Sequence, residues 1–150
     1  MYYYINYILK EILPASEFSN YYIFPQVSIY SFIKVHSSLE QDESEYASRN
    51  YWAKSIDFVI CYCHKADRQY LYTPVLFMEL DGSSHFSSAK YGTKTFRRQQ
   101  ENDRFKDSLF SDLNIPLIRF QIPDNHLTRK DLPRLRLLLS KYFPWQSQNK

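Results

Sequence analysis

Three acidic residues lie in or beside two short apolar segments. Asp57 lies within SIDFVICYC, and Glu79 and Asp81 close the segment TPVLFMELD. Residues two apart on a strand share a face, so Glu79 and Asp81 project to the same side of the second segment. If the two segments pair as a hairpin that sets Asp57 opposite them, three carboxylates converge. Such carboxylates repel one another unless a hard cation neutralises them, so we predict a site for Mg2+ or Mn2+.

A divalent ion bound by carboxylates indicates phosphodiester hydrolysis. It polarises the phosphodiester, lowers the pKa of a bound water and stabilises the charge that builds up during in-line displacement. The alternative is that each acid is an ordinary strand-end residue in water. Apolar neighbours argue against that alternative, because Ile56 and Phe58 flank Asp57, and a buried charge needs a partner.

The segments that must position these acids alternate between helix and strand. The predicted elements are a helix over 2–18 with an early end or break near Pro14, strands over 21–33, 55–63 and 73–80, a helix over 96–113, a strand over 116–122, and a helix over 131–142. Between them, residues 37–50 are expected to form a surface loop or insertion, 64–72 a connection and 82–95 a loop. Pro25 favours an edge strand or a bulge, and Asp131 is expected to cap the last helix, with Pro133 in its first turn.

The fold class follows from the two central strands. Both are apolar on both faces, which predicts helices on each side of the sheet. We therefore expect an α/β fold with a mixed central sheet of about four strands flanked by helices. It forms a single domain over residues 1–150, with a flexible tail at 144–150.

Composition limits the partners only weakly. The chain has 150 residues, a formal net charge of +3 and a pI near 8.8, which are compatible with a phosphate-bearing partner without establishing one. Residues 1–10 lack the basic region and cleavage site of a signal peptide, and no apolar run approaches the roughly 18 residues that a membrane span needs. A cytoplasmic protein without a membrane partner is expected.

The two cysteines are predicted to be buried strand residues. Cys61 and Cys63 are two apart, so they share a strand face and are poorly placed for a structural disulfide. With His64 they suggest a zinc site, but structural zinc needs four ligands at suitable spacing.

Four stretches carry a resemblance to a known family. IDFVI, FMELDGSSH, RFKDSLF and IPLIRF, in this order, resemble the PD-(D/E)xK nucleases, over roughly residues 20–122. They are most similar to a prokaryotic branch of uncharacterised domains that resemble very-short-patch-repair endonucleases. In that branch a strand ending E-x-D-G-x-x-H precedes a helix with D-x-x-K and a strand reading L-x-R-F. The resemblance implies a restriction-endonuclease-like α-β-β-β-α-β core, with Asp57 and Glu79 as metal ligands and Asp81 as a third ligand or a holder of metal-bound water.

The chain departs from the superfamily at one position. Its Glu79-Leu80-Asp81 stands where the superfamily has E-x-K, whose lysine orients or activates the attacking water. On the following helix Gln99, Asp103 and Lys106 share a face. We predict that Lys106 substitutes for the missing lysine and that Gln99 and Asp103 support the site; the alternative is a solvated helix face.

Other polar residues are expected near the site. His85 has a counterpart in the branch resembled and could act as base or stabilise the leaving oxygen, although a loop histidine is usually just exposed. Arg119 lies in an apolar strand and needs a partner, a substrate phosphate or a site carboxylate, unless its head lies in water at an edge. Gln26 is expected to reach the site from the first strand. Neither Glu11 nor Glu17 is assigned the glutamate that the family's first helix often contributes.

A basic flank follows the acids. A phosphate-contacting surface or an ordinary solvated one is expected at Lys90, Tyr91, Lys94, Arg97 and Arg98. The basic residues of the last helix are distributed around it, which indicates packing and a possible dimer surface; they are Lys130, Arg134, Arg136 and Lys141.

The predicted function is a Mg2+-dependent DNA endonuclease. One alternative is a nucleic-acid-binding module that kept the nuclease fold and lost hydrolysis. Another is a protein-interaction subunit of a DNA-processing complex that uses its tyrosine-rich surface. The resemblance favours DNA, and the residues themselves do not distinguish DNA from RNA. No reader motif is present, so specificity would come from DNA structure, a homodimer or a partner protein in a DNA-processing or defence system.

Overall fold

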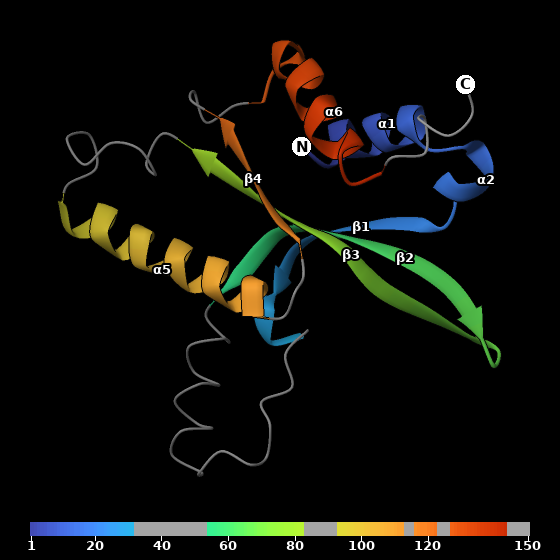
Figure 1. The fold of residues 1–150 in the computed structure, drawn as a ribbon, viewed down its shortest axis with the longest axis horizontal. Coiled ribbons are helices and arrows are strands. Elements are labelled where there is room, and N and C mark those ends of the chain that lie inside the picture. The colour runs from blue at the N-terminus through green and yellow to red at the C-terminus, as the bar shows by residue number, and fades with distance from the viewer. Residues whose placement is uncertain (32–53, 83–92, 113–115, 123–126, 144–150) are drawn as a thin grey trace.

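A four-stranded sheet lies between helices on both of its faces (Figure 1). The structure is a computed structural model that describes residues 1–31, 54–82, 93–112, 116–122 and 127–143. Its elements are α1 (Tyr2–Ile12), α2 (Ala15–Phe18), β1 (Tyr21–Ser28), the short 3-10 helix η1 (Ile29–Ser31), β2 (Ser55–Ala66), β3 (Gln69–Gly82), α5 (Thr93–Asp112), β4 (Leu117–Ile122), the 3-10 helix η3 (Arg129–Asp131) and α6 (Leu132–Ser140). None of the helices in these ranges is long and apolar enough to cross a membrane.

The strands follow one another across the sheet in the order β1-β2-β3-β4. β1 pairs antiparallel with β2, β2 pairs antiparallel with β3, and β3 pairs parallel with β4. A parallel pair needs a crossover connection, and the chain between β3 and β4 contains α5. The predicted α/β fold with a mixed four-stranded sheet is confirmed.

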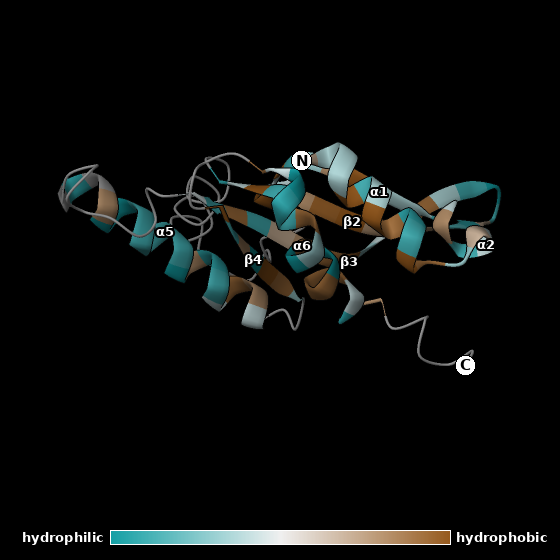
Figure 2. Ribbon diagram, turned by 90° about the horizontal axis from the view of Figure 1, so that it is seen from above, coloured by the Kyte–Doolittle hydropathy of each residue, from teal (hydrophilic) through white to brown (hydrophobic). Residues whose placement is uncertain are grey.

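Each face of the sheet has its own apolar core. Phe58 and Ile60 of β2 pack in the larger cluster, which includes apolar residues of α1 and α6. Val59 alternates to the other face and packs in a smaller cluster with Phe77 and Phe110, whose ring centroids lie 4.7 Å apart. The long helix α5 is hydrophilic along most of its length (Figure 2), and Leu109 and Phe110 near its end pack against the sheet in this smaller cluster.

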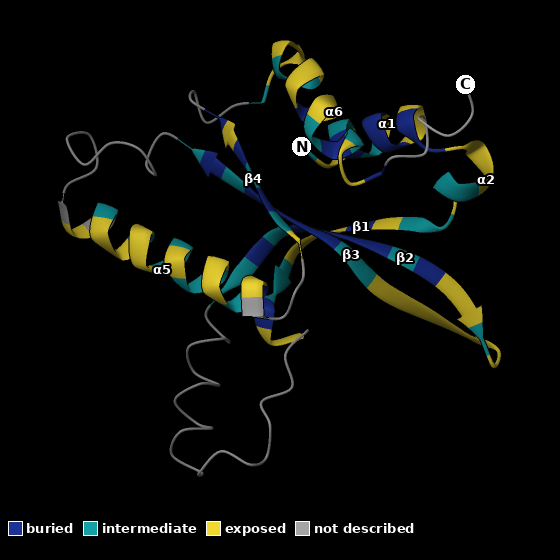
Figure 3. Ribbon diagram, in the orientation of Figure 1, coloured by how far each residue is buried: buried dark blue, intermediate teal, exposed yellow. Residues whose placement is uncertain are grey.

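The prediction of a connection at residues 64–72 is wrong. β2 runs to Ala66 and β3 begins at Gln69, so a two-residue turn joins them. Asp67 and Arg68 adopt φ values of 46° and 70°, the left-handed region that two-residue hairpin turns of type I′ require at both positions. The outer half of this hairpin is exposed (Figure 3), and the mostly polar residues from His64 to Gln69 interrupt the apolar signal around the turn.

Other boundaries differ by a few residues. The first helix breaks at Leu13 and Pro14 as predicted, leaving α1 and the single turn α2. β1 ends at Ser28, where η1 turns the chain, and α5 begins at Thr93. The predicted loop at 37–50 and the tail at 144–150 lie outside the described residues.

Asp131 precedes α6 as predicted, with Pro133 in the first turn, but its carboxylate caps the preceding turn instead. One oxygen of Asp131 accepts hydrogen bonds from the backbone N–H and the hydroxyl of Thr128, both at 2.9 Å. The hydrogen bond from the Thr128 backbone is the main reason that the pKa of Asp131 is lowered from its ordinary value of 3.8. The side chain remains partly exposed, which limits how much this cap contributes.

We expect Asp131→Ala to lower the free energy of unfolding by up to about 1 kcal/mol at neutral pH. Because the pKa of Asp131 is lowered by folding, its stabilisation is present above pH 3.8 and is lost as the pH falls through the lower, folded value. Urea denaturation at pH 7 and at acidic pH measures the difference. An equal loss at both pH values would contradict the role assigned to the charged cap.

Candidate active site

Asp57 and Glu79 lie next to each other on the face of the sheet that α5 covers. β2 and β3 pair with Phe58 opposite Met78, which sets Asp57 across from Glu79. The backbone N–H of Leu80 donates a 2.8 Å hydrogen bond to Asp57 Oδ2 and fixes that carboxylate against β3. Both acids line a pocket of about 380 Å3, together with Leu80, Arg98, Gln99, Asn102, Asp103 and Lys106. The structure thus brings together two of the three predicted acids and the whole predicted face of the helix.

Glu79 is a buried carboxylate with one oxygen paired and one free. The residue as a whole is only 4% exposed. Oε2 accepts a 2.8 Å hydrogen bond from Lys106 Nζ, and Oε1 is buried without a hydrogen-bond partner among the described residues. Burial is the main cause that raises the pKa of Glu79 above its ordinary value of 4.5, while Lys106 opposes the shift. A buried carboxylate oxygen without a partner is rare in native structures and fits a bound cation.

Gln26 reaches the site from β1, as expected. Its Nε2 donates a 3.2 Å hydrogen bond to Asp57 Oδ1, so each oxygen of Asp57 accepts one bond. Pro25 and Val27 pair with residues of β2, but Gln26 between them is skipped in the register and has φ 52°. Left-handed backbone costs a non-glycine residue about 1 kcal/mol or more. The irregularity predicted at Pro25 on this edge strand therefore aims the Gln26 amide at Asp57.

Asp81 contacts Arg119. Asp81 is 6% exposed, and its Oδ1 accepts a 3.0 Å hydrogen bond from Arg119 Nη1. Arg119 also binds Asp103 at 3.2 Å and Asp107 at 3.0 Å. Within the described residues no three His, Cys, Asp or Glu side chains are grouped so as to hold a metal ion. In this arrangement Asp81 pairs with Arg119, and its role as a third metal ligand or a holder of metal-bound water stays a prediction.

Arg119 has the site-carboxylate partner that was one of its two expected partners. β4 pairs with β3 so that Arg119 lies beside Glu79, and its guanidinium joins three aspartates from β3 and α5. Burial works against the charge of Arg119, but the aspartates outweigh it and raise the pKa of Arg119 above its ordinary value. The guanidinium thereby ties α5 to the two strands that carry the pocket.

Lys54 and Asn102 belong to the site but were not found from the sequence. Lys54 Nζ donates a 3.0 Å hydrogen bond to Asn102 Oδ1 and lies 4.0 Å from the centre of the Phe105 ring. Burial lowers the pKa of Lys54, and the nearby charges of Lys106 and Arg98 lower it further. Three cations thus lie close enough to influence one another beside the pocket. The only sequence signal for Lys54 is its place directly before β2.

The remaining predicted site residues are either exposed on α5 or lie outside the described residues. Lys94, Arg97 and Arg98 are exposed on α5, and of these Arg98 lines the pocket. His85, Lys90 and Tyr91 lie outside the described residues.

The two cysteines are buried and free, as predicted for strand residues. Burial raises the pKa of the Cys61 thiol to about 11, so the thiolate that binds metals is disfavoured at neutral pH.

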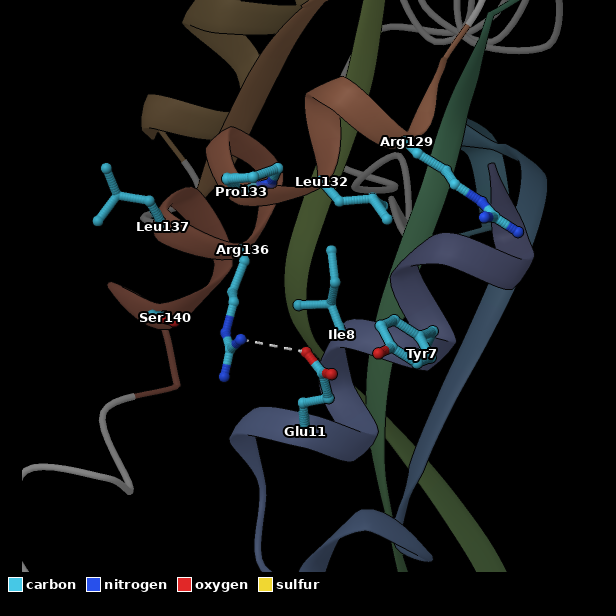
Figure 4. A pocket seen from close by; sticks show the side chains of 9 residues that line it. All are labelled: Tyr7, Ile8, Glu11, Arg129, Leu132, Pro133, Arg136, Leu137 and Ser140. Carbon is cyan, nitrogen blue, oxygen red and sulfur yellow. Dashed lines mark ion pairs between the residues drawn. The ribbon is translucent and has the colours of Figure 1, made fainter.

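A second pocket lies between α1 and α6 (Figure 4). It has a volume of about 570 Å3, and at its rim Arg136 Nη1 of α6 lies 3.3 Å from Glu11 Oε2 of α1. Both helices pack on the face of the sheet opposite to α5. Glu11 is therefore separated from Asp57 and Glu79 by the sheet, consistent with its not being assigned to the site.

We expect Glu79→Gln to raise the melting temperature at neutral pH in metal-free buffer. Because folding raises the pKa of Glu79, its contribution to stability is most favourable below pH 4.5 and is lost as the pH rises through the folded value. The gain from the substitution should therefore appear above pH 4.5 and level off above the folded pKa. Calorimetry across this range measures it, with Glu11→Gln as the surface control; a variant less stable than the parent at neutral pH would contradict the assignment.

Comparison with known proteins gives one match. The family model described as "Protein of unknown function (DUF2726)" matches residues 4–133, which include every described residue of the pocket. Comparison with curated proteins and with solved structures finds no match. Since the match covers well over half of the sequence, the chain belongs to the DUF2726 family.

Proposed function

We propose that this protein is a divalent-metal-dependent nuclease of the PD-(D/E)xK type that hydrolyses phosphodiester bonds of DNA. The observation that carries the proposal is the pocket in which Asp57 and Glu79 lie side by side and Lys106 contacts Glu79. The resemblance of four sequence stretches to that superfamily, in the order and spacing of its motifs, supports the same reaction.

The donor groups of the pocket suit Mg2+ or Mn2+. Asp57 and Glu79 would hold the ion, and the unpartnered Oε1 of Glu79 supplies an oxygen that needs a positive partner. One or two carboxylates suffice for Mg2+, which keeps several waters and takes further oxygens from substrate phosphates. When bound, the ion supplies Lewis acidity and acidifies water. Leu80 and Gln26 orient Asp57 for this role through its two hydrogen bonds.

Lys106 takes the place of the missing motif lysine. Its ammonium group lies at Glu79, as a lysine must to orient the attacking water or stabilise the developing phosphate charge. Lys54 and Arg98 add positive charge at the same pocket, which favours a polyanionic substrate. The resemblance supports DNA rather than RNA as the substrate, and the sequence supports a cytoplasmic location.

A binding module without hydrolysis is the second candidate. The ion pair between Lys106 and Glu79 neutralises a buried carboxylate without any metal ion, as a site that has lost its metal would require. Such a module would retain DNA affinity without turnover.

A cleavage assay separates the two. The parent, Asp57→Asn and the control Glu11→Gln are incubated with supercoiled, linear, mismatched and single-stranded DNA in Mg2+ and in Mn2+. The nuclease predicts cleavage by the parent and by Glu11→Gln that is lost in a folded Asp57→Asn. DNA binding without cleavage in either metal would overturn the nuclease and favour the binding module.

A further inference from the structure

A group of exposed aromatic side chains lies on the same face of the sheet as the candidate active site. The four residues Tyr22, Phe24, Tyr70 and Tyr72 are here called the aromatic strip, and they are between 37% and 66% exposed. Large aromatic side chains usually bury most of their surface, so a group of them left open on one sheet face indicates a binding surface.

The register of the strands sets these rings on that face. Phe24 pairs with Val59 and Tyr22 with Cys61, both of which pack in the core under α5. Tyr72 pairs with Cys63, two residues farther along the same face. Asp57 is two residues before Val59 on β2 and therefore shares its face, so the pocket of Asp57 and Glu79 and the aromatic strip follow one another along the same strands.

The rings form one continuous group. The Tyr72 ring lies 5.2 Å from that of Tyr22 and 5.5 Å from that of Phe24, in both cases edge to face. Loss of solvation is the main cause that raises the pKa of Tyr72, and the nearby Tyr70 raises it further. Phe24 stands two residues from Gln26, whose amide binds Asp57. The strip therefore begins about 7 Å along β1 from a residue of the candidate site.

The charge around the strip suits a polyanion. Lys65 pairs with Tyr70 on the same face, and the adjoining turn carries one charge of each sign, at Asp67 and Arg68. None of the strand positions paired on this face between Val59 and the turn is acidic. At the other end Arg98 and Lys106 line the pocket, and Lys54 lies close enough to both to feel their charge.

We propose that the aromatic strip binds single-stranded nucleic acid by stacking on its bases and leads the strand to the pocket of Asp57 and Glu79. Aromatic rings beside basic groups are the usual means of binding single strands without sequence preference, because every base has a face to stack. A duplex hides those faces, so the strip selects single strands, unpaired ends or mismatched regions. This inference deepens the proposed nuclease function and rests on it for the fate of the bound strand.

The test measures binding separately from cleavage. Affinity for fluorescein-labelled oligothymidylate and for a duplex of equal length is measured by anisotropy in EDTA. The variants are Tyr72→Ala, the ring-conserving Tyr72→Phe, and Tyr3→Ala, which removes an exposed ring from α1 on the other side of the sheet. We expect Tyr72→Ala to weaken oligothymidylate binding by about 10-fold, with the other two within about 2-fold of the parent.

Each outcome decides the proposal. Unchanged oligothymidylate affinity in folded Tyr72→Ala, or no binding by the parent, overturns it. A variant that changes the oligomeric state in size-exclusion chromatography and leaves the affinity unaltered also overturns it, and assigns the strip to a second copy of the chain. If Tyr72→Ala loses affinity while the parent cleaves no DNA, the binding role of the strip is supported and the nuclease is contradicted. If the parent cleaves DNA and the affinity of Tyr72→Ala is unchanged, the nuclease is supported and the binding role of the strip is contradicted.

Discussion

Lys106→Met is expected to lower the rate of DNA cleavage by about 100-fold or more. Lys106 Nζ lies 2.8 Å from Glu79 Oε2, and its side chain is 13% exposed, so this ammonium group is held at the candidate metal ligand. A positioned proton-transfer group contributes about 100- to 10,000-fold to the rate of hydrolysis. Its removal also leaves Glu79 with neither oxygen paired. Single-turnover cleavage with excess enzyme measures the chemical step.

Two variants separate the chemistry from general charge. Arg104→Met removes an exposed cation from the same helix, outside the predicted phosphate-contacting flank, and should change the rate little. Lys106→Arg keeps the charge but changes the donor geometry, so we expect partial activity. A Lys106→Met variant that cleaves at the parent's rate would show that this lysine does not replace the motif lysine.

Arg119→Leu is expected to have the largest effect on stability, a loss of about 3 kcal/mol. Arg119 binds Asp81, Asp103 and Asp107 at distances of 3.0 to 3.2 Å. Removing the guanidinium leaves the carboxylate of Asp81, only 6% exposed, without this charged partner. A buried charge that loses its partner costs far more than the net contribution of the pair. Urea denaturation at neutral pH measures the loss.

The double variant tests that reason. Arg119→Leu combined with Asp81→Asn removes the charge that was left behind and should recover part of the lost stability. Arg97→Leu, on the exposed face of α5, is the control and should change the free energy of unfolding by no more than about 0.5 kcal/mol. Additive losses in the double variant would contradict the coupling between Arg119 and Asp81.

Several features of the candidate site lower the stability of the folded chain. Glu79 is buried with one unpartnered oxygen and a raised pKa, both of which destabilise the folded chain without a cation. Gln26 keeps a left-handed backbone while its amide binds Asp57. Strain of this kind is maintained where the surrounding structure enforces it, commonly at functional sites. A binding partner that neutralises Glu79 would relieve most of this cost.

The central strands could be predicted from sequence because their apolar patterns are strong. Phe58, Ile60 and Met78 fill one core, and Val59 and Phe77 fill the other, which produces the continuous apolar runs that predict covered strands. The spacing of Gln99, Asp103 and Lys106 placed them on one helix face, and all three line the pocket.

The rest could not be predicted because it depends on contacts between distant segments. The hairpin turn at Asp67 and Arg68 lies between exposed strand ends, and the mostly polar residues from His64 to Gln69 interrupt the apolar signal there. Asp81 shares a face with Glu79, but its carboxylate pairs with Arg119 of the parallel neighbour β4. Lys54 contacts residues almost fifty positions away in sequence. Pairing between strands and the placement of α5 decide each of these contacts.

The binding of Mn2+ to the parent, followed by electron paramagnetic resonance, tests most directly whether Asp57 and Glu79 form the metal site. We expect saturable binding that Glu79→Gln weakens by at least about 10-fold, because the substitution removes the charge beside the unpartnered Oε1. Glu11→Gln, which alters a carboxylate on the opposite face of the sheet, should bind as the parent does. Equal Mn2+ affinity in the parent and Glu79→Gln would contradict a metal-dependent nuclease built on this pair of carboxylates.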